Sequence, residues 1–396
     1  MNKIAIKLKP AAERMVKKGH PWIFEDSIVK QNKPAKTGDL AIIFDTKKNK
    51  FLASGFYDED SVIKIKCFQF HTQIEIDNDF FKDKIKDAFS KRRELINKDN
   101  NSYRLIYGEN DFLPSLVVDV YNKTAVIKIY SMIWVKYLDL ISQCIKNIIG
   151  LDNIVLRLSR NIEEKAKGFN LFNGKCLVGN LEDSKVVFKE NGLNFIADVV
   201  NGHKTGYFLD QRQNRKKVGK LAKGKTVLDV FSYNGGFTVN ALCNGAKEVT
   251  SIDISKQAID SIQDNLNFNT YTGKFYFICD DAFTALNQLI KDGKKFDIVV
   301  IDPPSFAKKE SEIKKAKEQY TRLAKLGSKL VNKQGILVLA SCSSRVSEKE
   351  FIECNELAFK NENVRVEVIE KTNHDIDHLA IIPEMNYLKC VYYRML

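Results

Sequence analysis

Carboxylate side chains follow several apolar segments in the second half of the chain. Asp229 lies in the run LDVF, Asp253 follows 24 residues later in SIDIS, and Asp281 lies in DDAF after a third apolar run. A carboxylate after a strand accepts hydrogen bonds from ribose hydroxyls, and the acid and the ring of DDAF suit an adenine amino group and ring face. Three such acids in succession favour a nucleoside ligand over surface decoration.

Two glycines follow the first of these runs after three intervening residues. Gly235 and Gly236 allow the main chain to approach a ligand closely, and a helix N-terminus after them favours an anionic group. A tight structural turn is the alternative explanation of the glycine pair alone. Because the loop lacks the third glycine and the spacing of G-x-G-x-x-G, we predict an adenosine ligand without a pyrophosphate.

One cysteine stands where covalent chemistry is feasible. Cys342 follows the apolar run ILVLAS, and serines flank it. Carbon 5 of a pyrimidine accepts a methyl group only after a thiolate has added to carbon 6, whereas a base nitrogen needs no such nucleophile. Cysteine is more often a small core residue, but polar neighbours at a strand end favour the nucleophile. The segment therefore predicts a cysteine nucleophile, and in a methyltransferase it would imply methylation at carbon 5.

A rigid acidic turn ends a fourth apolar run. Asp302 is followed by two prolines that fix the turn, so its carboxylate can orient a flipped-out base. Ser305 stands between the prolines and Phe306, which counts mildly against methylation of an exocyclic amine. The base that removes the C5 proton stays open among Asp302, Glu384 and His378.

The segment 219–226 matches the phosphate-loop pattern G-x-x-x-x-G-K-[ST] only in its letters. A true phosphate loop follows a strand and opens a helix, because the helix N-terminus holds the phosphates. Here a helical pattern precedes the segment and the strand pattern TVLDVF follows it. A nucleoside triphosphate site is therefore rejected.

Basic residues predominate, above all near the N-terminus. The 396 residues include 63 Lys and Arg against 50 Asp and Glu, a net charge of +13. Residues 1–70 hold 14 basic and 8 acidic residues, so +6 of the surplus lies there. An RNA partner is expected, with solubilising lysines as the alternative. Cations bind phosphates and rings stack on bases, so the candidate contacts are Lys17, Lys18, His20 and Trp22.

Alternating and helical patterns indicate how the first half of the chain folds. Residues 3–70 contain short alternating runs such as IAIKL and DLAIIFD, which predict a small β-rich module. Residues 79–97 repeat apolar positions at helical spacing and predict an amphipathic helix with a basic outer face. LPSLVVDVY and TAVIKIYS predict a hairpin around Asn122 and Lys123, so the middle part is expected to be α+β.

Strand and helix patterns alternate regularly after residue 191. KTVLDVFSY, KEVTSIDIS, KFYFICDDAF, KFDIVVIDPPS and GILVLASCSS read as strands with helical stretches between them. This alternation predicts an α/β fold with a parallel sheet that is covered by helices on both faces. Ligands of such sheets bind at the carboxyl ends of the strands, which is where the acids and Cys342 stand.

Cysteine spacing and hydropathy bear on metals and on cell location. The eight cysteines include no C-x-x-C pair, so neither a zinc site nor a disulfide framework is expected, and no metal is predicted. No apolar run reaches 18 residues, and MNKIAIKLKP lacks a signal-peptide core, so a cytoplasmic protein without a membrane partner is expected. The oligomeric state stays open, a homodimer included.

The motifs together resemble a known family. LDVFSYNGG, SIDIS, DDAF and IDPPSF are similar to a class I S-adenosylmethionine-dependent methyltransferase. The wider order, a basic β module with HPW, a middle α+β part and NGHKTGYFLDQR before the cofactor domain, resembles the bacterial 23S rRNA cytosine-5 methyltransferase family with an N-terminal PUA domain. The resemblance covers nearly the whole chain; HKTGYFLDQR and ASCSS are its most specific segments, and the middle matches least.

The resemblance implies a domain order, a cofactor and a substrate. The domains are a PUA-like domain at 1–72, a middle α+β domain at 73–186 and a Rossmann-like methyltransferase domain at 187–396, with seven strands and an antiparallel last strand at 388–394. The cofactor is S-adenosylmethionine, and the substrate is a cytosine of 23S rRNA before the subunit is fully assembled.

The resemblance also completes the list of candidate site residues. In the family KTGYFLDQR packs over the cofactor, although a structural strap is the alternative for each of its residues. The cofactor candidates are Thr205, Phe208, Gln211, Asp229, Phe231, Tyr233, Gly235, Asp253, Asp281, Ala282 and Asp302. The catalytic candidates are Cys342 and Asp302.

Two other functions remain as alternatives. One is an rRNA methyltransferase that acts on a base nitrogen, for which Cys342 would be incidental. The other is a non-catalytic RNA-binding ribosome assembly factor with a vestigial cofactor fold. The retained acids Asp229, Asp253, Asp281 and Asp302 argue against the second alternative.

Overall fold

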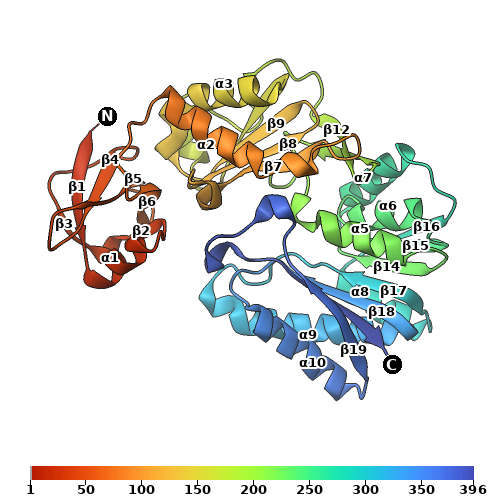
Figure 1. Ribbon diagram of the computed structural model, residues 1–396. Coiled ribbons are helices and arrows are strands. Elements are labelled where there is room, and N and C mark those ends of the chain that lie inside the picture. Colours follow the sequence, from red (N-terminus) through yellow and green to blue (C-terminus); the bar gives the residue numbers. More distant parts are fainter. Residues whose placement is uncertain (1) are drawn as a thin grey trace. The chain divides into compact units, whose positions relative to one another are not determined.

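A computed structural model describes residues 2–396, which form two compact units (Figure 1). The first unit comprises 2–189, 197–208 and 377–382, and the second comprises 190–196, 209–376 and 383–396. The chain therefore passes between the units several times. Two of these passages lie in β12 (Lys185–Glu190) and β13 (Leu193–Asp198), which form a two-stranded sheet. None of the described helices is long and apolar enough to span a membrane.

The N-terminal part of the first unit is a six-stranded sheet, as its alternating pattern predicts. The strand order is β2-β6-β5-β4-β1-β3, and only β1 and β4 pair in parallel among these neighbours. A helix that the pattern did not predict begins with Pro10, whose missing N–H is harmless in a first turn. The elements are β1 Lys3–Leu8, α1 Pro10–Lys17, β2 Trp22–Phe24, β3 Ile28–Gln31, β4 Leu40–Phe44, β5 Phe51–Tyr57 and β6 Ile63–Phe70.

The middle part of the first unit is a five-stranded sheet with helices packed on its apolar face. The strand order is β11-β10-β9-β8-β7, and β8 and β9 form the predicted hairpin, with Tyr121 opposite Thr124. One apolar core joins this part to the N-terminal sheet, since Phe56 and Phe68 pack with Phe81 and Trp134. The elements are α2 Asn78–Ser90, β7 Ser102–Tyr107, β8 Leu116–Tyr121, β9 Thr124–Ile129, α3 Leu138–Ile149, β10 Asn153–Leu158, α4 Glu163–Lys167 and β11 Cys176–Val178.

Helix α2 is shorter than predicted, and its surface is not basic. It ends at Ser90 and carries three Lys and three Asp residues. Beyond its end, Arg92 turns into the interior and donates to both carboxylate oxygens of Asp111 at 2.7 and 2.6 Å. The predicted basic outer face is therefore wrong, because the residues that made the segment basic lie past the helix.

The second unit contains a seven-stranded sheet with helices on both faces (Figure 1). The order is β16-β15-β14-β17-β18-β20-β19; the first five strands run parallel, and β20 is antiparallel to β18 and β19. This confirms the α/β class and the antiparallel last strand. The elements are α5 Arg212–Leu221, β14 Thr226–Val230, α6 Gly236–Cys243, β15 Glu248–Asp253, α7 Lys256–Asn267, β16 Lys274–Cys279, α8 Ala282–Lys291, β17 Phe296–Ile301, α9 Ile313–Leu330, β18 Val331–Ser341, α10 Glu348–Asn361, β19 Val366–Thr372 and β20 Lys389–Met395.

The apparent phosphate loop lies at a helix-to-strand junction. Gly219 is inside α5, and Thr226 is the first residue of β14. No helix N-terminus follows the segment, so its main-chain N–H groups cannot cradle phosphates in the way that a phosphate loop does. The predicted order of helix, segment and strand is confirmed, and it is not the order of a phosphate loop.

Candidate active site

The loop between β14 and α6 has an uncommon backbone conformation. Phe231, Tyr233 and Gly235 have φ values of 63°, 48° and 78°. Residues other than glycine rarely adopt positive φ, and such strain concentrates at ligand-binding sites. At Gly235 a Cβ atom would lie 2.8 Å from Cγ2 of Ile262 in α7, so a larger residue would push the loop away from that helix.

Asp229 of β14 has a buried carboxylate oxygen that lacks a donor. Its side chain accepts hydrogen bonds at Oδ2 from the main-chain N and Oγ1 of Thr238, at 3.1 and 2.7 Å. Oδ1 is buried with no hydrogen-bond partner in residues 2–396. Burial raises the pKa of Asp229 to about 6; the bonds from Thr238 oppose this rise, and the charge of Asp253 adds to it. An unsatisfied buried acceptor costs ~1–3 kcal/mol, so a donor from a ligand would stabilise the site.

Asp253 connects the ends of β14 and β15. Its Oδ2 accepts from the main-chain N of Tyr233 at 2.9 Å, and its Oδ1 accepts from the main-chain N of Ser255 at 2.9 Å. The strand-end acids are therefore brought to one edge of the sheet, as the sequence predicts. Each carboxylate oxygen has a second lone pair that a ribose hydroxyl could use.

Asp281 stands at the neighbouring strand end and caps a helix. The main-chain N of Asp280 donates to Asp253 O at 3.1 Å, which places the ends of β15 and β16 side by side. Asp281 is exposed, and its Oδ1 accepts from the main-chain N of Thr284 in the first turn of α8 at 3.1 Å. Ala282 is buried at the start of that helix. The capping role accounts for the acid structurally, and its contact with an adenine stays a prediction.

Asp302 follows β17 and joins a buried chain of amides. Gln211 Nε2 donates to Asp302 Oδ2 at 3.0 Å, and Gln211 Oε1 accepts from Asn214 Nδ2 at 2.6 Å. Asn214 Oδ1 in turn accepts from the hydroxyls of Thr372 and Tyr392 at 2.5 and 3.1 Å. This chain fixes the orientation of the Gln211 amide, and hence the position of the Asp302 carboxylate.

The pKa of Asp302 is raised to about 7. Burial of the carboxyl group is the main cause, and the negative charges of Asp210 and Asp229 add to it. The bond from Gln211 and the charge of Arg215 act in the opposite direction. An acid with a pKa near 7 can take up and release a proton at neutral pH, which suits general acid–base catalysis.

Cys342 follows β18 and lies against the Asp302-Pro303 turn. Its Sγ is 3.8 Å from Pro303 O. The serines beside it are tied to the protein: Ser341 Oγ donates to the Tyr320 hydroxyl at 2.9 Å, and Ser343 Oγ donates to Ala307 O at 3.2 Å. The two predicted catalytic residues therefore stand on touching turns, although their sequence positions are 40 apart.

Two charged residues at this site were not singled out from the sequence. Asp210, next to Gln211, is buried and accepts from the Tyr387 hydroxyl at 2.6 Å. Lys389 of β20 is buried near the loop after Cys342. A lysine within the otherwise apolar run YLKCVYY is the signal that could have revealed it, because a charge in a central strand requires buried partners.

Several predicted residues lie in the first unit. Thr205 is buried there, where it donates to Asp119 Oδ2 at 2.6 Å, and Phe208 lies under the Lys204 ammonium. His378, one of the three candidate bases, is also buried and bonds through Nδ1 to Asp377 at 2.7 Å. The cofactor contacts of Thr205 and Phe208 stay predictions. Glu384 is exposed in the second unit.

The predicted RNA contacts differ in how accessible they are. Lys17 and Lys18 are both exposed, but Lys17 forms ion pairs with Glu13 and Asp45 at 2.6 and 2.7 Å, which offset its charge. The rings of His20 and Trp22 meet edge to face at 5.8 Å, and both residues are half-buried. The two lysines of the predicted contact are thus accessible, and the two rings are partly so.

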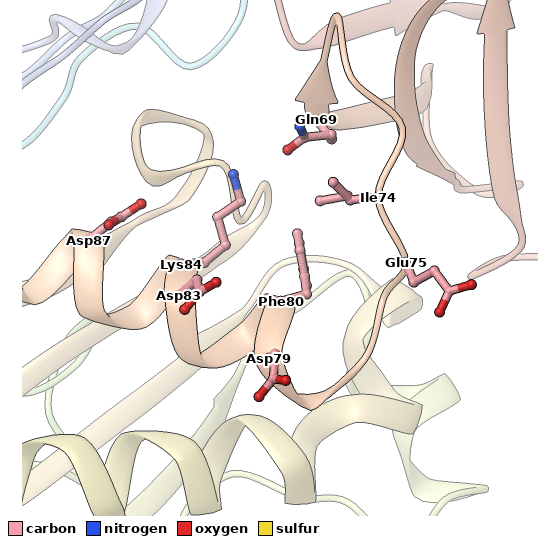
Figure 2. Close-up of a pocket in the computed structure, with 8 residues that line it drawn as sticks. All are labelled: Gln69, Ile74, Glu75, Asp79, Phe80, Asp83, Lys84 and Asp87. Atoms are coloured by element: carbon pink, nitrogen blue, oxygen red, sulfur yellow. The ribbon is translucent and has the colours of Figure 1, made fainter.

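A pocket of about 290 Å³ in the first unit has the wrong charge for RNA (Figure 2). Four carboxylates and a single ammonium group line it, so it would repel phosphates. The lining residues are Gln69, Ile74, Glu75, Asp79, Phe80, Asp83, Lys84 and Asp87. A second pocket of about 290 Å³, in the second unit, is lined by Lys389 and by residues 344–348, which follow Cys342. No three His, Cys, Asp or Glu side chains within residues 2–396 are grouped to hold a metal ion.

Comparison with known proteins identifies the family. Residues 174–380 match the model of S-adenosylmethionine-dependent methyltransferases, and residues 6–70 match the model of a PUA-like domain. The chain belongs to this methyltransferase family. It is 36% identical to the ribosomal RNA large subunit methyltransferase of Deinococcus radiodurans, over 99% of this chain and 98% of the relative. It is 33% identical to ribosomal RNA large subunit methyltransferase I of Klebsiella pneumoniae, over 96% of each chain.

Solved structures share the fold of this methyltransferase. SMU.776, a methyltransferase crystallised with SAH, superposes with a TM-score of 0.84 at 20% identity, over 100% of both chains. Trm5b of Pyrococcus abyssi superposes with a TM-score of 0.52 at 14% identity, over 100% of this chain and 99% of that one. At these identities the likeness establishes the fold alone.

S-adenosylmethionine is the cofactor, and the edge formed by β14 and β15 fits it. The unpartnered Oδ1 of Asp229 is a buried acceptor for an ammonium or hydroxyl donor, and Asp253 offers lone pairs to ribose hydroxyls. The positive φ values of the loop between them let the main chain approach the ligand. These residues would hold the cofactor next to the Asp302 turn, since Asp302 N bonds to Val230 O at 3.4 Å.

Proposed function

We propose that this methyltransferase transfers a methyl group to carbon 5 of a cytosine in large-subunit ribosomal RNA, with Cys342 as the nucleophile. The contact of 3.8 Å between Cys342 Sγ and Pro303 O carries the proposal, because it brings a thiol beside the acidic turn. The names of the relatives, ribosomal RNA large subunit methyltransferases, support the substrate class. Methylation of a base nitrogen would need no thiol at this place.

The proposed mechanism uses two residues of the second unit. The Cys342 thiolate adds to carbon 6 of the cytosine, and the electron pair of the C5–C6 double bond makes carbon 5 nucleophilic. Bound S-adenosylmethionine supplies the electrophilic methyl group that carbon 5 accepts. A base then takes the proton from carbon 5, the double bond re-forms, and the thiolate leaves carbon 6.

Asp302 is our choice among the three candidate bases. A pKa of about 7 leaves a large fraction of its carboxylate ionised at neutral pH and lets it release the proton again. It also stands on the turn that Cys342 contacts, and the bond from Gln211 orients it. Acting directly or through one water molecule, it would remove the C5 proton.

The N-terminal module is proposed to bind the RNA. Residues 6–70 match a PUA-like domain, which supports the proposed domain at 1–72. The middle domain at 73–186 and the methyltransferase domain at 187–396 stay proposals. The exposed Lys18 and the half-buried His20 and Trp22 offer a cation and two rings to an RNA backbone and its bases. This module would therefore hold the RNA while the second unit carries out the chemistry.

The test is to map the methyl group made by wild-type protein and by Cys342→Ala. We expect nucleoside mass spectrometry of treated large-subunit RNA to show 5-methylcytosine with wild type and none with the variant. Calorimetric binding of S-adenosylmethionine serves as the control, since Cys342 does not bind the cofactor in this account. A methyl group found on a base nitrogen, or full activity of the variant, would refute the proposal.

A further inference from the structure

Lys389 is the one lysine of the second unit that is buried beside the predicted nucleophile. It is the first residue of β20, where it pairs with Ser341, the last residue of β18, in antiparallel register. Cys342 is the next residue after Ser341. The strand pairing therefore fixes the backbone of Lys389 at the exact end of the strand from which Cys342 emerges.

The side chain of Lys389 turns into the loop that follows Cys342. Its exposed fraction is 4%, and Nζ donates to the main-chain oxygens of Ser343 and Val346 at 2.5 and 2.7 Å. These are neutral partners, and no carboxylate of the described residues lies within ion-pair distance of Nζ. An ammonium group that is desolvated without a direct counter-ion is costly, so its position needs an explanation.

The charges around Lys389 indicate what could stabilise the buried ammonium. Burial lowers the pKa of Lys389 to about 8, and the negative charge of the Cys342 thiolate is the strongest influence in the opposite direction. Glu348 and Glu350 of α10 act in the same sense more weakly. Glu350 is engaged as the cap partner of Ser347 and pairs with Lys317. With Cys342 ionised, its charge would be the main one that stabilises the ammonium, and the ammonium would in turn stabilise the thiolate.

We propose that Lys389 is a positioning residue that holds Cys342 as a thiolate, by keeping a buried ammonium against the loop after it. The Cys342 thiol gives its proton to water, and Lys389 keeps its own proton, so that an ammonium and a thiolate face each other. The two bonds from Nζ also hold the main chain of the 343–346 loop, which follows Cys342. Lysine near a cysteine is a known means of raising the thiolate fraction. This role of Lys389 rests on the proposed function, because a thiolate at Cys342 serves catalysis only if Cys342 is the nucleophile.

The experiment measures the alkylation rate of Cys342 by iodoacetamide as a function of pH in the full-length protein. Mass spectrometry of the peptide that contains Cys342 separates it from the other seven cysteines. The variants are Lys389→Met and Lys389→Arg, with Lys333→Met as the control, because Lys333 is an exposed lysine at the other end of β18. Thermal unfolding and S-adenosylmethionine binding report whether each variant folds.

We expect the midpoint of the wild-type alkylation profile to lie below the ~8.5 of an ordinary cysteine. In Lys389→Met the midpoint should rise by at least one pH unit, so that the rate at pH 7 falls ~10-fold while the rate at pH 10 is little changed. Lys389→Arg should keep most of the shift because it keeps the charge. A purely structural role for Lys389 would change unfolding but not this midpoint.

Either of two results would overturn the inference. One is a folded Lys389→Met protein with the wild-type alkylation profile; the other is a wild-type midpoint at or above ~8.5, which needs no variant at all. The assay uses no RNA and no methyl transfer. The two proposals can therefore fail separately. If the protein methylates a base nitrogen but its alkylation midpoint is low, the proposed function is refuted, whereas the effect of Lys389 on Cys342 is not.

Discussion

At the scale of single residues, the raised pKa of Asp302 makes the stability of the protein depend on pH. Its folded-state pKa of about 7 lies far above the value of ~3.9 for an unfolded chain. The folded protein therefore binds the proton more tightly, and the stability contributed by this group is present below pH ~4 and is lost as the pH rises through 7. Asp229 acts in the same direction with its pKa of about 6.

Asp302→Asn should remove the part of this pH dependence that Asp302 contributes and leave the part that Asp229 contributes. In urea unfolding at pH 5 and at pH 8, the free energy of unfolding of wild type should fall by ~1–3 kcal/mol more than that of the variant, measured without cofactor. Asp229→Asn is the matched control and should remove a smaller part of the fall. Parallel pH profiles of wild type and Asp302→Asn would show that the carboxyl is not held in the environment described above.

Residue types and spacing predicted where the acids and the thiol lie. They did not predict which residues contact these side chains. Asp229, Asp253, Asp302 and Cys342 were chosen because each follows an apolar run, and parallel strands place those positions along one edge. The partners could not be found in this way. Lys389 reaches the site through an antiparallel pairing with β18, a long-range contact that no local pattern encodes.

At the scale of elements, the turn from β14 into α6 leaves no room for a side chain at Gly235. Gly235 combines a φ of 78° with a Cβ position only 2.8 Å from Ile262 Cγ2. A side chain there is strained in its backbone and displaces α7 or the loop.

Gly235→Ala should therefore weaken cofactor binding while the sheet stays folded. We expect calorimetry to give a dissociation constant for S-adenosylmethionine at least ~10-fold higher. If it costs ~1.4 kcal/mol to bring the loop into its binding geometry, the affinity falls by that factor. Gly224→Ala is the control, since Gly224 also has positive φ, at 72°, but its Cβ position meets nothing within 4 Å. Equal loss of affinity in both variants would mean that backbone strain in general, and not the contact with α7, sets the affinity.

The elements themselves were predicted unevenly. Strands and helices of the second unit follow their hydrophobic periods closely, because the central strands β14, β17 and β18 are largely buried and helices cover the sheet on both faces. Helix α1 was missed within a segment dominated by strand patterns, and α2 was extended too far. The end of α2 is decided by the buried pair of Arg92 and Asp111, which is a tertiary contact.

At the scale of the whole molecule, the uneven charge predicts how RNA binding depends on salt. The N-terminal module cannot simply be removed to test this, because Phe56 and Phe68 belong to a core shared with Trp134. We therefore expect the effect from replacing exposed lysines with glutamine at Lys18, Lys47 and Lys48. The slope of log affinity against log salt should become shallower by up to ~2, since each phosphate contact contributes ~0.7.

A triple variant elsewhere in the first unit is the matched control. Lys98, Lys123 and Lys146 are equally exposed but lie outside the N-terminal module. Their replacement by glutamine lowers the net charge by the same amount and should leave the slope nearly unchanged. If both triple variants changed the slope equally, the N-terminal lysines would act through total charge and not as a binding surface.

The sequence patterns did not predict which segments of the chain return to the first unit. Segments 197–208 and 377–382 belong to the first unit, although the residues around them belong to the second. These returns are set by buried contacts such as Thr205 with Asp119 and the main-chain N of Arg104 with Asp377, at 2.6 and 2.8 Å. Periodicity describes the elements, whereas polar pairs far apart in the sequence decide which unit a loop joins.

The central claim is a covalent bond between Cys342 and carbon 6 of the target cytosine. The most direct measurement is to incubate the protein and S-adenosylmethionine with large-subunit RNA that contains 5-fluorocytosine. Fluorine at carbon 5 cannot be removed as a proton, so the adduct cannot be released. We expect a protein–RNA complex that survives denaturation, with the linkage mapped by peptide mass spectrometry to Cys342 and absent in Cys342→Ala. Methyl transfer to normal RNA without any trapped complex, or a linkage at another residue, would contradict the account.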